Sequence, residues 1–209
     1  MLKKLLSGLL PPDSRRDLAL KYRSFPNKVL VHVYNGEQTG TTAFFRNRSL
    51  LDTMMELLAE EKSKELNILF HASSIGAEPY SFAIGCARAG LDKSHSLRID
   101  ATDLNPRFLE AAKEAQYSDD VLSLMTRDEK AWFESGGENI ILPIRPIRKM
   151  VNFLPAMSFV DARMTRSYDV VFVTNALAYV SEEEQSRTID NISRYNAGYL
   201  ILTAFHPDT

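Results

Sequence analysis

The residues best suited to chemistry in this sequence begin with a glycine turn and a carboxylate, Gly76 and Glu78. An apolar run precedes the turn, and Glu78 and Pro79 stand where a helix would start. A strand that enters a helix through such a turn is where α/β proteins bind nucleotide-like cofactors, because the backbone at Gly76 can approach the ligand and the helix start presents free N–H groups. The turn holds one glycine and is not a GxGxxG phosphate cradle. The carboxylate would also repel a pyrophosphate, so we predict a cofactor with cationic or hydroxyl groups.

A second carboxylate, Asp103, follows residues 97–102, which are predicted to form the next strand. Ligands of open α/β sheets bind beyond the carboxyl ends of the strands, and a carboxylate at this strand end can accept both hydroxyls of a ribose. Aspartate is also a frequent helix cap, and a helix is predicted from Pro106. Ribose binding and helix capping therefore remain alternative roles for Asp103.

The third polar feature is the pair Thr174 and Asn175, at the end of the strongly apolar run 168–174. Polar residues end many strands, so the pair alone says little. Together with the glycine turn and Asp103, it indicates three polar strand ends that meet at one edge of a sheet. The sequence thus favours a ligand site at that edge.

Strands and helices alternate along most of the chain, which indicates an α/β fold with a mostly parallel sheet and helices on both faces. The predicted strands are residues 66–72, 97–102, 140–144, 149–154, 168–174 and 198–205. The predicted helices are residues 50–65, 79–89 and 106–115, one from a Thr126/Glu129 capping box through Phe133, and one from a Ser181/Glu184 capping box to about Tyr195.

The first part of the chain has a different character. Residues 1–23 lean basic, and leucines between positions 2 and 10 recur at helical spacing, which predicts a short helix that docks on the domain. A basic amphipathic contact with a membrane surface or a partner is the alternative. Residues 29–34, VLVHVY, predict an extra strand, and Asn35 and Gly36 predict a turn after it. We therefore divide the chain into residues 1–40, with the helix and the extra strand, and a domain of residues 41–209.

The composition is that of an ordinary globular chain of one domain: 209 residues, 44% hydrophobic and 25% charged, with a formal net charge of -2. The near-neutral charge gives no reason to expect nucleic-acid binding. The lone cysteine, Cys86, excludes an internal disulfide and favours a cytoplasmic location. The four histidines share no metal-ligand spacing, so we predict no metal site. No apolar run reaches membrane-spanning length, and Gly8 and Pro11 break the apolar start, so we expect neither a membrane span nor a signal peptide.

Four segments of the chain share a further pattern: TTAFFRN, SSIGAEPYS, ATDLN with the later AQYSDD, and VFVTNALAYV. SSIGAEPYS resembles STGEEPYS, and TTAFFRN resembles TxFFR, in the chemotaxis-receptor methyltransferases (the CheR type), which use S-adenosylmethionine. ATDLN resembles that family's second-strand segment, and VFVTNALAYV resembles its FCRNVxIYF segment. The four segments stand in the family's order and cover most of the chain. The resemblance implies a Rossmann-like class I methyltransferase fold.

The resemblance also implies roles for individual residues. Arg46 would lie near the reacting centre and Tyr179 near the methyl group, as the candidate catalytic residues. Glu78 would face the charged amino-acid part of the donor, and Asp103 would hold the ribose. The cofactor-binding residues predicted in this way and from the glycine turn are Thr42, Arg46, Gly76, Glu78, Asp103 and Asn175.

These roles agree with the chemistry of methyl transfer. Transfer from a sulfonium is an in-line displacement, so the site mainly supplies alignment and electrostatics. A carboxylate acceptor, such as a glutamate of a receptor protein, needs no strong base because it is already ionised at neutral pH. A methyltransferase with a small-molecule acceptor, and a non-catalytic binding or regulatory module that keeps the fold, are the alternatives.

The sequence departs from the family pattern at several positions. Gly40 stands in place of an asparagine, Ala77 in place of the first glutamate of GEEPYS, Thr174 in place of an arginine, and Met157 in place of an asparagine. The resemblance implies that the exchange to Met157 loses a side-chain hydrogen bond to the adenine region, and the loss of a buried polar contact costs about 1 kcal/mol or more. The departures favour the non-catalytic alternative, whereas the retained residues favour an enzyme.

The apolar segment 199–205 is predicted to lie at an edge of the sheet, where apolar strands are usually covered or paired. We expect either the extra strand 29–34 or a second subunit, in a homodimer, to cover it. The segment between Asp120 and Asn152 could hold the small strand insertion by which some family members grip a receptor tail.

Overall fold

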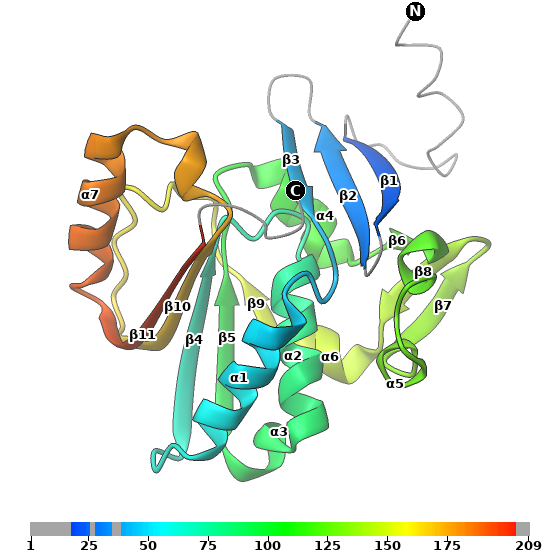
Figure 1. The fold of residues 1–209 in the computed structure, drawn as a ribbon, viewed down its shortest axis with the longest axis horizontal. Coiled ribbons are helices and arrows are strands. Elements are labelled where there is room, and N and C mark those ends of the chain that lie inside the picture. The colour runs from blue at the N-terminus through cyan, green and yellow to red at the C-terminus, as the bar shows by residue number, and fades with distance from the viewer. Residues whose placement is uncertain (1–17, 26–27, 35–38, 204–209) are drawn as a thin grey trace, which may run out of the picture.

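A five-stranded parallel sheet forms the centre of the computed structural model, which describes residues 18–25, 28–34 and 39–203 (Figure 1). Its strands run in the order β11-β10-β4-β5-β9, and every neighbouring pair is parallel. The bounds are β4 (Glu65–His71), β5 (Ser96–Ala101), β9 (Val151–Phe153), β10 (Tyr168–Thr174) and β11 (Asn196–Thr203). The predicted parallel sheet is therefore confirmed.

The sheet is buried on both faces, which explains why its strands are apolar at consecutive positions. Side chains of a strand alternate between the two faces. Ile68 and Phe70 of β4 point into a large core on one face, together with Phe172 of β10. Leu69 of β4 and Val171 of β10 point into a smaller core on the other face.

Helices cover both faces, as predicted. The helices that contribute buried residues to the larger core are α1 (Arg48–Ala59), α2 (Ala77–Ala89), α3 (Leu91–Ser94), α4 (Pro106–Glu114) and α6 (Arg145–Met150). The smaller core is covered by α7 (Glu182–Ile192), which stands apart from the other helices in Figure 1, and includes Leu177 of the short turn η3 (Leu177–Tyr179). The strand predicted over residues 149–154 begins only at Val151, because Lys149 and Met150 end α6.

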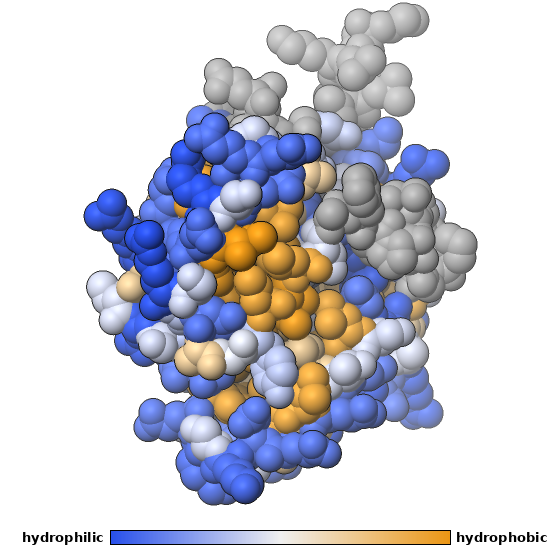
Figure 2. Space-filling view, turned by 60° about the vertical axis from the view of Figure 1, so that its left-hand side comes forward, coloured by the Kyte–Doolittle hydropathy of each residue, from blue (hydrophilic) through white to orange (hydrophobic). Residues whose placement is uncertain are grey.

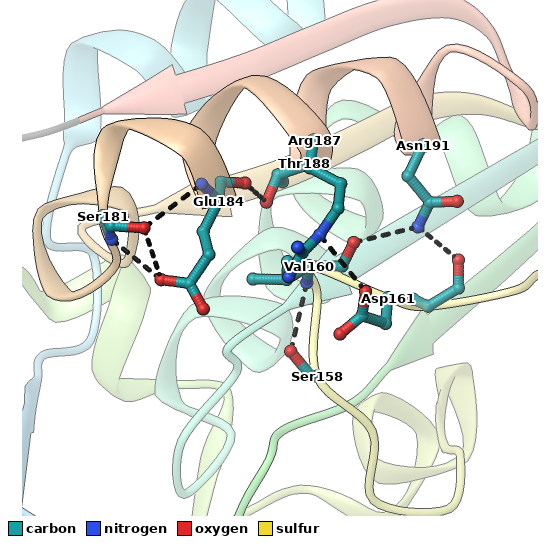
Figure 3. Close-up of polar contacts among 9 residues, drawn as sticks. Ser158, Val160, Asp161, Ser181, Glu184, Arg187, Thr188 and Asn191 are labelled. Atoms are coloured by element: carbon teal, nitrogen blue, oxygen red, sulfur yellow. Dashed lines mark hydrogen bonds and ion pairs between the residues drawn. The ribbon is translucent and has the colours of Figure 1, made fainter.

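Polar contacts between α7 and a neighbouring loop complete the second face (Figure 3). The Asn191 side chain donates a hydrogen bond of 2.5 Å to the Ala162 carbonyl. Arg187 Nε lies 3.4 Å from Asp161 Oδ1. These contacts fasten the segment that follows β9 to the helix, so its path over the sheet is defined.

Both predicted capping boxes are formed, Thr126 with Glu129 and Ser181 with Glu184. The first opens α5, which is shorter than predicted because strand β7 already begins at Phe133. A small antiparallel sheet, with strand order β6-β8-β7, occupies the region between α4 and β9. This small sheet comprises β6 (Tyr117–Ser118), β7 (Phe133–Gly137) and β8 (Ile140–Pro143), and its region also holds η2 (Asp119–Leu122) and α5 (Arg127–Lys130).

The beginning of the described chain differs from its prediction. A three-stranded antiparallel sheet forms there from β1 (Ala19–Phe25), β2 (Lys28–Tyr34) and β3 (Thr39–Thr42). The strand predicted over residues 29–34 is confirmed, but it is one of three strands, since β1 and β3 were not predicted. The leucine-rich stretch 2–10 and the turn at Asn35 and Gly36 lie outside the described residues.

The alternation of polar and apolar residues explains why β1 is a strand. Exposed Lys21 and Arg23 alternate with half-buried Leu20 and Tyr22, a period of two residues that suits a strand with one buried face. The boundary predicted after residue 40 also falls inside β3, which leads directly into the main domain.

Strand β11 pairs only with β10 among the described residues, so it lies at an edge of the main sheet. The prediction that residues 29–34 cover this edge is wrong, because β2 pairs with β1 and β3 instead. Tyr199 and Leu202 of β11 are 37% and 36% exposed. Hydrophobic residues gather at the centre of the face that Figure 2 turns forward, on this side of the molecule.

Gly76 and Gly90 allow a test of how the fold uses glycine. Both have positive φ angles, 86° and 73°, but a Cβ at Gly76 would lie 3.1 Å from Ala112, Phe153 and Tyr80, whereas a Cβ at Gly90 would meet nothing within 4 Å. We expect Gly90→Ala to cost about 1 kcal/mol in backbone strain and Gly76→Ala to cost roughly 1–2 kcal/mol more, because it also crowds the core. Urea unfolding of both variants measures the difference. Equal losses of unfolding free energy would contradict the packing role of Gly76.

Candidate functional site

A cleft of about 260 Å³ lies at the carboxyl ends of β4, β5 and β10, where β3 approaches the main sheet. All but one of the residues predicted from the sequence line it: Thr42, Arg46, Glu78, Asp103, Asn175 and Tyr179. They come from distant segments of the chain, and the parallel strand order brings them together.

Gly76 is the predicted residue that does not line the cleft. It precedes the first residue of α2 in a left-handed conformation, and apolar side chains fill the space beside it. Its role in the structure is to turn the chain so that Glu78, two residues later, reaches the cleft. A contact between Gly76 and a cofactor stays a prediction.

Asp103 is held in place by the backbone around it. Its Oδ2 accepts a hydrogen bond of 2.8 Å from the Ser74 amide, and its Oδ1 accepts one of 2.9 Å from the Asn105 amide. The cap of α4 is Asn105, whose side chain accepts from the Arg107 amide at 3.0 Å. The capping alternative for Asp103 is therefore wrong. Burial raises the pKa of Asp103, while the backbone hydrogen bonds act in the opposite direction.

Glu78 brings a second carboxylate to the cleft, between a hydroxyl and a cation. The Thr174 hydroxyl donates a hydrogen bond of 2.7 Å to Glu78 Oε2. Burial raises the pKa of Glu78, and the bond from Thr174 and the nearby charge of Arg46 oppose that rise. Arg46 is itself buried, and its Nη1 donates to the Thr41 carbonyl at 3.1 Å.

The backbone around the cleft is strained. Phe45, Ala72, Ser74 and Asn175 have φ angles between 50° and 55°, a region that residues other than glycine rarely adopt. Ala72, Ser74 and Asn175 line the cleft, and Phe45 is the neighbour of Arg46. Such strain concentrates where a backbone must present groups to a ligand.

Ser74 Oγ and Asn175 Oδ1 are buried at the cleft and have no hydrogen-bond partner in the described part of the chain. Buried polar atoms are nearly always paired, so these two suit a ligand. Ser74 was missed from the sequence, although its place just after a buried strand is a usable signal. Leu104, Phe108 and Phe159, also missed, add an apolar wall.

Tyr179 lies at the rim of the cleft and is 75% exposed. It belongs to the short turn η3, which follows β10. Tyr179 therefore lies at the entrance of the cleft rather than deep in it.

The four departures from the family pattern have different consequences. Thr174 forms the hydrogen bond to Glu78 and is part of the site. Ala77 is fully buried in α2 and does not line the cleft. Met157 contributes its backbone, whose amide donates to the Asp103 carbonyl at 3.0 Å. Gly40 lines the cleft and leaves space, since a Cβ there would be 3.6 Å from the nearest atom.

The described residues contain no group of three or more His, Cys, Asp or Glu side chains that could hold a metal ion. In the same residues, no helix has the length and apolarity needed to cross a membrane.

The strand order and the position of the cleft define a Rossmann-like α/β domain with a ligand site beyond the carboxyl ends of its parallel strands. Residues 40–203 match the family described as "CheR methyltransferase, SAM binding domain". The chain therefore belongs to the CheR methyltransferase family, and S-adenosylmethionine is the cofactor of its domain.

Curated relatives agree with this assignment. A chemotaxis protein methyltransferase of Vibrio anguillarum is 28% identical over 187 residues, which cover 85% of this chain and 68% of the relative. One of Listeria innocua is 30% identical over 148 residues, or 68% of this chain and 55% of the relative. The chain thus spans about two thirds or less of the length of these relatives. Among solved structures, the glycopeptide N-methyltransferase MtfA complexed with sinefungin gives a TM-score of 0.48 at 11% identity, over 77% of this chain and 50% of its own.

The chemistry of the cleft residues fits S-adenosylmethionine. Glu78 would offer a negative charge to the ammonium group of the donor, and Asp103 would offer lone pairs to the ribose hydroxyls. Ser74 Oγ and Asn175 Oδ1 are available for further hydrogen bonds. Leu104 and Phe108 provide an apolar surface suited to the adenine ring.

The raised pKa of Glu78 predicts a pH-dependent affinity for the donor. As the pH falls through that pKa, Glu78 becomes protonated and its attraction for the ammonium group is lost, at a higher pH than for an ordinary glutamate. Calorimetry with S-adenosylhomocysteine, which keeps the ammonium group, measures this between about pH 8 and pH 5. We expect Glu78→Gln to bind more weakly at neutral pH and to depend less on pH. An unchanged pH dependence in Glu78→Gln would contradict this role.

Proposed function

We propose that this protein transfers a methyl group from S-adenosylmethionine to a carboxylate of a protein, as a chemotaxis-type methyltransferase. The observation that carries the proposal is the convergence of Arg46, Glu78, Asp103 and Asn175 on one cleft of a domain in the CheR methyltransferase family. The names of the curated relatives, chemotaxis protein methyltransferases, support a receptor as the substrate. A cytoplasmic location belongs to this proposal.

The residues of the cleft account for the reaction without a strong base. The bound donor supplies an electrophilic methyl group on a sulfonium. In the proposed reaction an oxygen of the acceptor carboxylate would attack the methyl carbon in line, the carbon–sulfur bond would break, and its electron pair would stay on sulfur. Arg46 can orient the acceptor carboxylate by charge-assisted hydrogen bonds, and Tyr179 at the rim can donate one near the transferring group.

The small sheet supports a protein substrate. Its strand β7 has little buried surface, and β7 pairs with β8 on one side only among the described residues. We place the receptor-tail contact suggested by the family resemblance at this small sheet.

One set of observations favours a second candidate, a binding or regulatory module without catalysis. Gly40 and Met157 bring no polar side chain to the donor site, so the affinity for the donor rests on fewer contacts. A small-molecule acceptor is the third reading, with the same donor site.

The donor site is tested by calorimetry with S-adenosylhomocysteine. We expect wild-type protein to bind it, and Asp103→Ala to weaken binding at least about tenfold, because a charge-assisted hydrogen bond to each ribose hydroxyl is lost. Asp103→Asn keeps one acceptor oxygen and should lie between the two. The exposed Asp92→Ala serves as a control and should bind as wild type. No binding by the wild type at millimolar ligand would remove the methyltransferase proposal.

The acceptor is tested by transfer of a labelled methyl group to glutamate-containing receptor peptides. Methyl esters are base-labile, so release of volatile methanol in alkali identifies a carboxylate acceptor. Donor binding without transfer to any peptide would move the conclusion to the small-molecule or the non-catalytic alternative.

We also propose that β11 pairs with its own copy in a homodimer. Its exposed edge carries Tyr199 and Leu202 and no charged residue from Tyr199 to Thr203. Leu202→Lys should convert a dimer into a monomer in sedimentation velocity, whereas the exposed Leu104→Lys should leave the dimer intact. A monomeric wild type would contradict this proposal and leave the methyltransferase proposal untouched.

A further inference from the structure

Arg46 lies in a turn, residues 44–47, between β3 and α1. Its Nη1 donates a hydrogen bond of 3.1 Å to the carbonyl of Thr41, in the strand just before the turn. Because the turn carries the guanidinium, contacts that hold the turn also help to place Arg46 in the cleft. The residues on either side of Arg46 show what holds it.

Phe44, two residues before Arg46, packs into the region of the small sheet. Its ring stands edge-on to Tyr117, with centroids 4.8 Å apart, and edge-on to Phe133, with centroids 5.2 Å apart. Edge-to-face geometry at these separations is the favourable arrangement for aromatic pairs. The start of the turn is thus anchored to β6 and to the first residue of β7.

Arg48, two residues after Arg46, forms a bidentate ion pair with Glu129. Its Nε and Nη2 donate to Glu129 Oε1 and Oε2 at 2.9 Å and 3.0 Å. The Glu129 side chain is only 3% exposed, and its Oε2 also accepts from the Thr126 amide at 2.8 Å. Burial alone would raise the pKa of Glu129, but the bonds from Arg48 and Thr126 outweigh it and lower the pKa.

Arg48 also contacts Phe45, the residue next to Arg46, so the ion pair is linked to the middle of the turn. The Arg48 guanidinium lies 5.6 Å from the centroid of the Phe45 ring. The Phe45 amide donates a hydrogen bond of 2.8 Å to the Ser81 hydroxyl of α2. Phe45 also has a strained φ of 50°, which persists only where surrounding contacts enforce it.

We propose that Glu129 is a positioning residue for the methyl-donor site, which acts through Arg48 and the turn 44–47 to place Arg46. The proposal rests on the methyltransferase function argued above. Glu129 does not line the cleft, and neither does any other residue between Phe108 and Phe159. The small sheet region is therefore part of the machinery that shapes the site, as well as the surface proposed for the receptor.

The physical basis is the rigidity of the ion pair. Two parallel hydrogen bonds between a guanidinium and a carboxylate fix direction as well as distance, which a single bond does not. The pair is buried on the carboxylate side, so solvent screens it little. Replacing Glu129 by Gln removes the charge and one acceptor oxygen, so the turn is held less firmly and can shift. A shift of about 1 Å at a reacting group is enough to impair a site.

A double-mutant cycle separates this role from a general structural one. S-adenosylhomocysteine affinity is measured by calorimetry for wild type, Glu129→Gln, Arg46→Ala and the double variant, well below the lowest unfolding temperature. We expect Glu129→Gln to weaken binding about fivefold, and to have less than about a twofold effect once Arg46 is Ala, because the residue it positions is gone. Arg48→Lys keeps the charge without the bidentate geometry and should weaken binding by an intermediate factor.

Glu134→Gln is the matched control. Glu134 belongs to β7 and pairs with Arg148 of α6 at 3.1 Å, so this variant also breaks one ion pair of the small sheet region, but one that does not touch the turn. We expect its affinity to stay within about twofold of wild type. If Glu129→Gln has no effect, or weakens binding equally with and without Arg46, the proposal is overturned. An Arg46→Ala variant that binds as wild type also overturns it. The methyltransferase function fails separately, through absence of binding by the wild type.

Discussion

The hydrogen bond from Thr174 to Glu78 is the contact on which the site depends. It joins the end of β10 to the start of α2, across the carboxyl edge of the sheet, at 2.7 Å. A buried carboxylate is costly unless it is hydrogen-bonded and faces a positive charge. Thr174 supplies the bond and Arg46 the charge, so the position of Glu78 constrains the turn after β4, the end of β10 and the turn before α1 at once. Burial raises the pKa of Glu78 in spite of these two contacts, so a cationic ligand group beside it would stabilise the carboxylate further.

The backbone near the cleft is also in an energetically unfavourable conformation. Ser74 and Asn175 combine strained φ angles with side-chain oxygens that lack partners among the described residues. A segment selected only for stability would place glycine at such angles and would pair such oxygens. Ser74 meanwhile donates its amide to Asp103, so its strain serves to fix the carboxylate proposed for the ribose. Backbone strain and unpaired oxygens therefore destabilise the folded state at the positions where ligand contacts are expected, and burial in the two apolar cores offsets this cost.

Much of this was predictable from sequence, because the strong signals are local. Apolar runs such as that of β10 and the polar residues that end them fixed both the parallel sheet and the edge at which Asp103 and Asn175 meet. The misjudged parts depend on contacts between distant segments. The helical spacing of the leucines in residues 2–10 drew attention away from the strand over residues 19–25. The pairing of β2 with β1 and β3 depends on contacts between strands, which the sequence of β2 alone does not specify. The family pattern marks Thr174 as the loss of an arginine, and only the fold reveals that its hydroxyl reaches Glu78.

These long-range contacts also change how the departures from the family pattern should be read. At position 174 the family pattern has an arginine, whose charge could balance the Glu78 carboxylate. In this chain the Thr174 hydroxyl donates a hydrogen bond to that carboxylate instead. Ala77 lies in the core and takes nothing from the cleft, and Met157 contributes through its amide, which any residue except proline would retain. Of the four positions, Gly40 is the one where a side chain facing the cleft is simply absent. Thr174 and the Ser74 amide therefore hold the two carboxylates of the cleft, and the retained Asn175 brings a buried oxygen to the same edge of the sheet, so these departures leave the polar character of the cleft in place.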